Sequence, residues 1–168
     1  QNAMSKGGPL REPVRALISR RMESVDAAEF ELASHIAISH DIKAILKPAR
    51  TLLASKEGVN PSILSSVLAV IGKFGGQEDM PAIEPLLQDK QVMMQRGKNG
   101  HIAVQVGDVA MTTMLAMMKK NPKDFGLETF GNHHSHGGQI AGFTDESKRR
   151  AARQKFAAAL SEWKKEKE

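Results

Sequence analysis

The chain has 168 residues and a mass of 18.3 kDa, a length that suits one compact domain with a sizeable core. Its 24 basic and 19 acidic side chains give a net charge of +5, and aromatic residues make up 4% of the sequence. This excess of charge is too small, and the stacking rings are too few, to identify a nucleic-acid-binding surface. The chain has no cysteine, which excludes disulfides, thiolate metal sites and cysteine nucleophiles.

The N-terminal region, residues 1–11, is expected to be a flexible tail because it contains Gly7-Gly8-Pro9. Gln1–Ala3 ahead of Met4 resembles a cloning scar, so the natural N-terminus can differ from the present one. No signal peptide or membrane-spanning apolar run is visible. The compartment stays open between cytoplasm and secretion.

Two helices are predicted before residue 41. The first begins near Glu12 and ends near Met22. The second has Asp26 as its N-cap and Glu29, three residues later, as the partner in a capping box, and it ends near His40.

Asp41 is predicted to cap the next helix, which carries an apolar stripe as far as Leu53. Pro48 interrupts this helix because it removes one backbone hydrogen bond. The helix either kinks at Lys47 or restarts at Pro48, and we favour the kink because the stripe stays in phase. Asn60 is the predicted cap of the following helix, with a proline at its first position.

The stretch Ile63–Asp89 carries two apolar stripes at helical spacing, separated by Gly75-Gly76. The glycines predict a helix stop and a tight reversal, and Pro81 suits the first turn of the second helix. One helical hairpin cannot bury both stripes alone, so it needs neighbours, as in a helical repeat. The stripes consist of Ile63, Val67, Val70, Ile71 and Phe74, followed by Met80, Ile83, Leu86 and Leu87.

This stretch resembles a HEAT repeat of the bacterial phycobilisome-lyase type. The resemblance rests on Ile71, Gly72, Lys73, Phe74, Gly75, Glu78, Pro81, Ala82, Ile83, Leu86, Leu87 and Asp89. It implies an all-α fold, a right-handed, armadillo-like α-solenoid of about three helical hairpins over residues 12–126. Members of this family usually serve as interaction scaffolds, and a few are enzymes, so the resemblance bears on fold more than on function.

A short β-hairpin is predicted near residues 92–106, inserted into the solenoid, because Asn99-Gly100 is a hairpin turn signal. A helix from Asp108 to about Lys120 follows. Its methionines could suggest a soft-metal site, but their spacing is that of a core-facing helix. They are Met111, Met114, Met117 and Met118. The segment around Gly107 resembles a bacterial HEAT-like segment in which that position more commonly holds arginine.

Residues 127–143 form a polar, Gly- and His-rich stretch, which predicts an irregular loop. His133, His134 and His136 are weak candidate metal ligands, because adjacent imidazoles in a loop rarely share one coordination sphere. A solvated polar loop is the simpler interpretation, and no cofactor is predicted.

Residues 144–168 are predicted to form a C-terminal helix that covers the last hairpin of the solenoid, because a terminal repeat otherwise exposes its apolar face. Thr144 or Asp145 is the expected cap, and Phe143 the hydrophobic staple. The apolar seam of the helix is Ala152, Phe156, Ala159, Leu160 and Trp163, surrounded by the basic residues Lys148, Arg149, Arg150, Arg153 and Lys155.

These features predict a non-catalytic scaffold that binds another protein or a sibling domain of a longer chain. Neighbours such as Ser34-His35 do not make a catalytic pair by adjacency alone. The inner surface of the solenoid and the β-hairpin are the expected contact regions. The candidate binding residues are Met93, Met94, Arg96, Lys98 and His101.

The alternative is a nucleic-acid-binding HEAT-like domain that uses basic helix faces, as alkylpurine DNA glycosylases of that fold do. The likeness is at the level of the fold alone, because the aromatic and acidic residues such enzymes need are not evident. The sole tryptophan, Trp163, belongs to the seam of the C-terminal helix.

Overall fold

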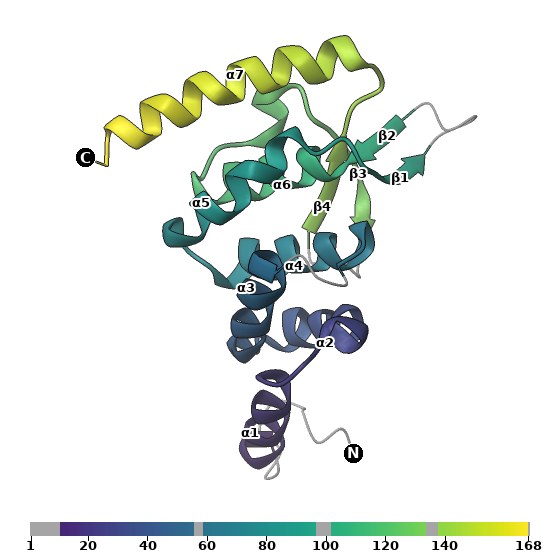
Figure 1. Cartoon of the computed structure of the whole chain (residues 1–168), viewed down its shortest axis with the longest axis vertical. Coiled ribbons are helices and arrows are strands. Elements are labelled where there is room, and N and C mark those ends of the chain that lie inside the picture. The colour runs from purple at the N-terminus through teal and green to yellow at the C-terminus, as the bar shows by residue number, and fades with distance from the viewer. Residues whose placement is uncertain (1–10, 56–58, 97–101, 134–137, 168) are drawn as a thin grey trace.

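The computed structural model of the chain describes residues 11–55, 59–96, 102–133 and 138–167. This part is mostly helical and includes two antiparallel β-hairpins. Figure 1 shows the helices stacked from α1 at one end of the long axis to α7 at the other.

The α-helices are α1 (Arg11–Met22), α2 (Ala27–His40), α3 (Leu46–Ser55), α4 (Pro61–Phe74), α5 (Met80–Ile83), α6 (Val106–Met117) and α7 (Glu146–Lys165). The 3-10 turns are η1 (Lys43–Ile45), η2 (Gln77–Asp79), η3 (Glu84–Gln88) and η5 (Pro122–Phe125), and the strands are β1 (Val92–Arg96), β2 (Ile102–Gln105), β3 (Glu128–His133) and β4 (Gly138–Gly142).

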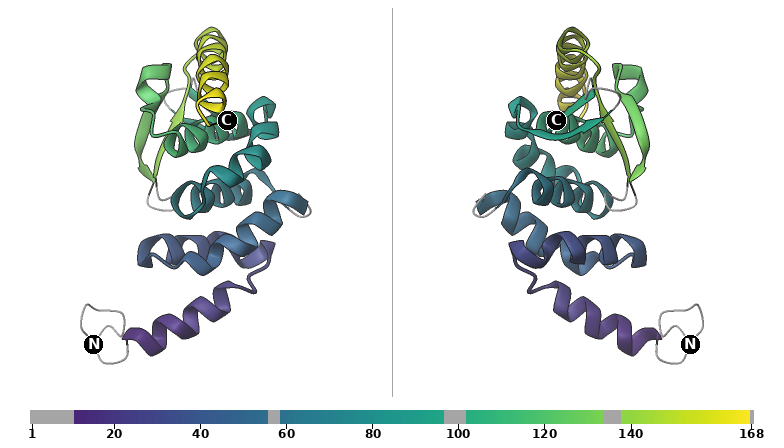
Figure 2. Two further views of the ribbon diagram at one scale, coloured as in Figure 1. Left: turned by 90° about the vertical axis from the view of Figure 1, so that its left-hand side faces the viewer. Right: turned by 90° about the vertical axis from the view of Figure 1, so that its right-hand side faces the viewer.

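The core lies between successive layers of helices. Helix α4 packs against α2 on one side and against α6 on the other, and α3 also packs on α4. The side views in Figure 2 show these layers stacked one on another, with α1 diverging at the N-terminal end. The largest side chains without solvent contact in these layers include Phe30, Ile45, Leu68, Ile71 and Met114. Burial of each such side chain contributes about 1.5–3 kcal/mol to folding.

The predicted helix starts at Asp26, Asn60 and Asp145 are confirmed. Each side chain accepts a hydrogen bond from the backbone N–H three residues later, at 3.1, 2.9 and 2.8 Å respectively. These bonds satisfy donors that a helix cannot pair internally. The capping-box role of Glu29 is not seen, because its carboxylate pairs with Arg21 instead.

The start of the third helix was predicted wrongly. Asp41 does not cap α3; it ends α2 in the left-handed conformation, with φ of 55°. The 3-10 turn η1 follows, with Ile42 before it and no side-chain cap, and continues directly into α3 at Leu46. Pro48 therefore lies in the first turn of α3, where its missing N–H has no helical acceptor to lose. In place of the favoured kink at Lys47, the chain changes from a 3-10 turn to an α-helix at Leu46, two residues before Pro48.

The second element of the central hairpin is shorter than predicted. A single α-helical turn, α5, lies between η2 and η3. Pro85 lies in the first turn of η3 and cannot donate a hydrogen bond back to α5, which accounts for the early end of this helix. The stop after α4 is confirmed at Gly75, and a side chain there would bring its Cβ to 2.6 Å from the carbonyl oxygen of Ile71.

The predicted hairpin near residues 92–106 is confirmed as β1 and β2, and α6 begins at Val106 rather than at Asp108. The methionine prediction is confirmed at Met111, Met114 and Met118, which are buried in the core.

The prediction of an irregular loop at 127–143 is wrong for its described part, because β3 and β4 form a second antiparallel hairpin there. Strand β4 lies beside β2, and an isolated bridge joins Ala103 to Phe143. Glycine is depleted in strands, so its abundance here favoured a loop over a hairpin.

An ion pair connects the layer of α3 to the turn between α4 and α5. Arg50 on α3 donates from Nε to Asp79 Oδ1 at 2.6 Å and from Nη2 to Asp79 Oδ2 at 2.8 Å. The Asp79 side chain is 7% exposed, and it also accepts the N–H of Gly76 at 2.9 Å. Burial alone would raise the pKa of Asp79, but the bonds from Arg50 and Gly76 outweigh it and lower that pKa.

A lowered pKa in the folded state stabilises the fold above the ordinary pKa of aspartate and loses this effect as the pH falls through the lowered value. We expect Arg50→Gln to lower the free energy of unfolding by about 1–2 kcal/mol near pH 7. The deficit should shrink as the pH falls below the ordinary pKa of aspartate, because protonation of Asp79 removes the charge that Arg50 pairs with. Urea denaturation at several pH values, from 7 to below the ordinary pKa of aspartate, measures this difference in the free energy of unfolding. Arg20→Gln is the exposed control. A deficit that is the same at every pH would contradict this role of Arg50.

Candidate functional site

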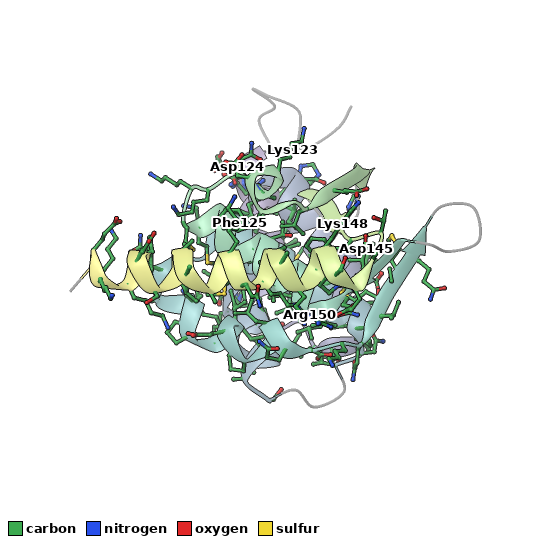
Figure 3. All side chains as sticks on the ribbon, turned by 90° about the horizontal axis from the view of Figure 1, so that it is seen from above. Lys123, Asp124, Phe125, Asp145, Lys148 and Arg150 are labelled. Carbon is green, nitrogen blue, oxygen red and sulfur yellow. The ribbon has the colours of Figure 1, made fainter. Side chains whose placement is uncertain are left out.

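Helix α7 closes the C-terminal end of the stack and forms one wall of the candidate site. Its apolar seam is confirmed: Ala152, Phe156 and Leu160 are buried against the helices below. The Phe156 ring meets Phe125 of η5 edge to face, with the ring centres 6.4 Å apart. Figure 3, which views α7 from above, shows Phe125 on one flank of the helix and Arg150 on the other.

A buried ion pair fixes the first turns of α7 to the body. Arg149 Nε lies 3.0 and 3.2 Å from the two carboxylate oxygens of Asp108 in α6, and the two side chains are 4% and 0% exposed. Arg149 Nη2 also donates to the carbonyl oxygen of Ala103 at 2.7 Å, and Asp108 accepts the N–H of Gln105 at 3.0 Å. This polar cluster therefore joins α7, α6 and β2 at one point.

The buried pair has both favourable and unfavourable electrostatic contributions. Burial raises the pKa of the Asp108 carboxyl, and the N–H of Gln105 and the guanidinium of Arg149 oppose that rise. Burial would lower the pKa of Arg149, but the carboxylates of Asp108 and Glu146 raise it, so the guanidinium stays charged. The Phe143 ring lies 5.5 Å from this guanidinium, so the expected hydrophobic staple is a cation–π contact.

A groove runs along α7 on the flank that faces η3. Its deeper part is a cavity of about 360 Å³. Leu87, Met111, Phe156 and Leu160 supply its apolar lining, and Glu84, Gln88, Arg153, Ala157, Ser161 and Lys164 complete it. Lys164 Nζ on α7 bonds to both carboxylate oxygens of Glu84 in η3, at 2.8 and 2.9 Å, and so bridges the two walls at one end.

The groove continues towards the N-terminal end of α7. A second hollow of about 390 Å³ is lined by Gln88, Lys90, Glu146, Arg150, Arg153, Gln154 and Ala157. Gln88, Arg153 and Ala157 line both hollows, so they form one continuous surface, which we call the α7 groove. Its apolar floor lies towards Lys164, and its polar half lies towards Arg150.

Arg153 lies where the two halves of the α7 groove meet. Its Nη2 donates to Gln105 Oε1 at 3.1 Å and lies 3.7 Å from Asp108 Oδ1. It would be only 2.8 Å from a Cβ on residue 107, so glycine leaves the space that this guanidinium occupies. Within the described residues, Arg153 Nε is buried without a hydrogen-bond partner.

The candidate residues from the sequence do not meet in this groove. Met93 and Met94 are half-buried on β1, and Met93 packs against the core. The backbones of Arg96 and His133 lie in β1 and β3. Lys98, His101, His134 and His136 lie outside the described residues, so the histidine metal site stays a prediction. The described part of the chain holds no group of three or more His, Asp or Glu residues placed to bind a metal ion.

Sequence reasoning missed the role of Arg149 by treating it as part of a solvated basic face. A signal was present, because residue 149 lies three positions before Ala152 and seven before Phe156, in phase with the apolar seam. An arginine on the buried face of a helix requires a buried anion. Asp108 gave no comparable signal, since an acid in the first turn of a helix is ordinary.

The α7 groove combines apolar and charged side chains. Its lining residues include no histidine or cysteine and no hydroxyl paired with a base. Apolar side chains form a floor and charged side chains of both signs form the rims, as in a protein interface with an apolar centre and a polar periphery.

We expect Arg149→Met to lower the free energy of unfolding by about 3–5 kcal/mol, because it leaves the buried Asp108 carboxyl without its partner. Lys148→Met is the control: Lys148 is exposed, and its surface pair with Glu128 is worth about 0–1 kcal/mol. Denaturant unfolding measures the loss in free energy of unfolding for each variant. The double variant Asp108→Leu with Arg149→Met should recover much of the loss. Equal losses for Arg149→Met and Lys148→Met would contradict the assignment.

None of the helices in the described ranges has the length and apolar character needed to span a membrane. Comparison of the chain with protein-family models, curated proteins and solved structures found no match.

Proposed function

We propose that this chain is a non-catalytic protein-interaction module, built from HEAT-like helix pairs, whose α7 groove receives an extended segment of a partner protein. The observation that carries the proposal is the groove itself. It combines an apolar floor, charged rims and a wall that is anchored by the buried pair of Arg149 and Asp108.

The layering of the helices supports the HEAT-like assignment. Helices α2 and α3 are followed by α4 and the α5–η3 segment, and α3 packs on α4 as η3 packs on α6. The same relation therefore recurs one step along the chain, as expected when each helix pair buries the apolar face of its neighbour. Arg50 and Asp79 connect one pair to the next.

The dimensions of the α7 groove favour a peptide segment over a compact ligand. Its lining residues on α7 run from Glu146 to Lys164, about 27 Å at 1.5 Å per residue. An extended peptide of about eight residues covers that length. The hollow over Met111 suits one apolar anchor side chain, and the half near Arg150 suits polar groups.

The groove is a better candidate than the hairpin that the sequence suggested. The described part of this hairpin packs on the body, since β1 contacts α4 and β2 contacts α6 and β4. The groove also carries acids as well as bases, including Glu84 and Glu146. Such mixed rims match a peptide better than the phosphates of nucleic acid, which favour unbroken basic surfaces.

A substitution that fills the groove tests the proposal. We expect a peptide selected on this protein from a random display library to lose at least tenfold in affinity for Ala157→Arg, because the new side chain would occupy the groove. Ala157 is exposed, so the fold should tolerate the change. Ala158→Arg is a matched control, being exposed on the next residue of α7 and outside the lining. Isothermal titration calorimetry measures the affinities.

Failure to select any peptide, or equal affinity for both arginine variants, would contradict the proposal. A titration with duplex DNA tests the nucleic-acid alternative. Binding with a steep salt dependence would favour the nucleic-acid alternative instead.

A further inference from the structure

A second surface lies at the opposite end of the molecule from α7, where α1 meets η1 and α3 (Figure 1). Two hollows of about 550 and 570 Å³ adjoin there and share Glu23 and Lys47. We call this the α1–α3 surface. Its lining residues are Leu17, Arg20, Arg21, Glu23, Ser24, Lys43, Ala44, Leu46, Lys47, Arg50 and Thr51.

The α1–α3 surface is strongly basic, since Glu23 is the single acid among these lining residues. Arg21 pairs with Glu29, and Arg50 pairs with Glu78 and Asp79. The remaining cations are Arg20, Lys43 and Lys47. All three are exposed and have no ion-pair partner in the described part of the chain. Their uncompensated charge attracts an anionic partner over about 8 Å at physiological ionic strength.

An exposed leucine lies among these cations. The Leu17 side chain is 71% exposed, more than the other large apolar residues of the described chain. It is not needed to hold α1 in place, because Ile18 and Met22 pack on the core. Arg15 also donates to the carbonyl oxygen of Asp41 at 2.7 Å. Leu17 therefore remains available to a partner.

We propose that the α1–α3 surface binds an acidic amphipathic helix of a partner protein. Two helices border the hollows, and a trough between helices accepts a third helix through an apolar ridge. Leu17 would meet that ridge, while Lys43, Lys47 and Arg20 would meet the acidic flanks. Phosphates of nucleic acid would leave Leu17 against charged groups, and no aromatic residue lines these hollows to stack on bases.

The test uses a synthetic peptide of about 15 residues, because shorter isolated helices are marginal in water. It has leucines at helical spacing on one face and glutamates elsewhere. The comparison peptide has the same composition in scrambled order. We expect fluorescence anisotropy at low salt to show binding of the amphipathic peptide at least tenfold tighter than that of the scrambled peptide.

The surface is mapped with exposed residues, so that the fold is preserved. Lys43→Glu with Lys47→Glu should weaken peptide binding at least tenfold, and Leu17→Ser should weaken it several-fold. Lys120→Glu is an exposed control away from this surface and should change nothing. Ala157→Arg should also leave this binding intact, which separates it from the α7 groove. Circular dichroism melts verify that each variant is folded.

Three results would overturn the proposal. If the scrambled peptide binds equally well, the binding depends on charge alone and not on an amphipathic helix. Unchanged affinity of the Lys43/Lys47 or Leu17 variants would place the peptide elsewhere. Tighter binding of duplex DNA or of phosphatidylserine vesicles than of the amphipathic peptide would assign the surface to another kind of partner.

Discussion

The buried pair of Arg149 and Asp108 is the interaction on which the C-terminal end of this structure depends. There α7, α6 and the base of the first β-hairpin meet through charged groups shielded from water. Phe156 and Leu160 supply apolar attraction, which is not directional. The hydrogen bonds of the Arg149 guanidinium are directional, so they fix the orientation of α7, which apolar contact alone does not.

Such a pair contributes less to stability than its geometry suggests. Removing two charges from water costs several kcal/mol per ion, and their attraction only partly offsets that cost. Its more useful consequence is positional. With the first turns of α7 fixed, the helix runs beside η3 at a spacing that leaves a hollow over Met111 and Leu87. The α7 groove is thus the result of a helix held at one end by charge and along its length by packing.

The two ends of the stack offer different chemistry. At the α7 end, charges of both signs surround an apolar floor, and Lys164 and Glu84 bridge the walls. At the α1 end, the lining is mostly basic and includes an exposed leucine. The packed layers of α2, α4 and α6 lie between these surfaces.

The sequence by itself determined the features that depend on neighbouring residues in the chain. The caps at Asp26, Asn60 and Asp145, the stop at Gly75 and the core methionines follow from local hydrogen bonding and periodicity, and each is present. Only the tertiary structure decided the rest. Strand β4 of the second hairpin lies beside β2 of the first, and Arg149 is buried because Asp108, 41 residues away, lies opposite it. Strand pairing and charge pairing join distant residues, and no local pattern specifies which distant residue will be the partner.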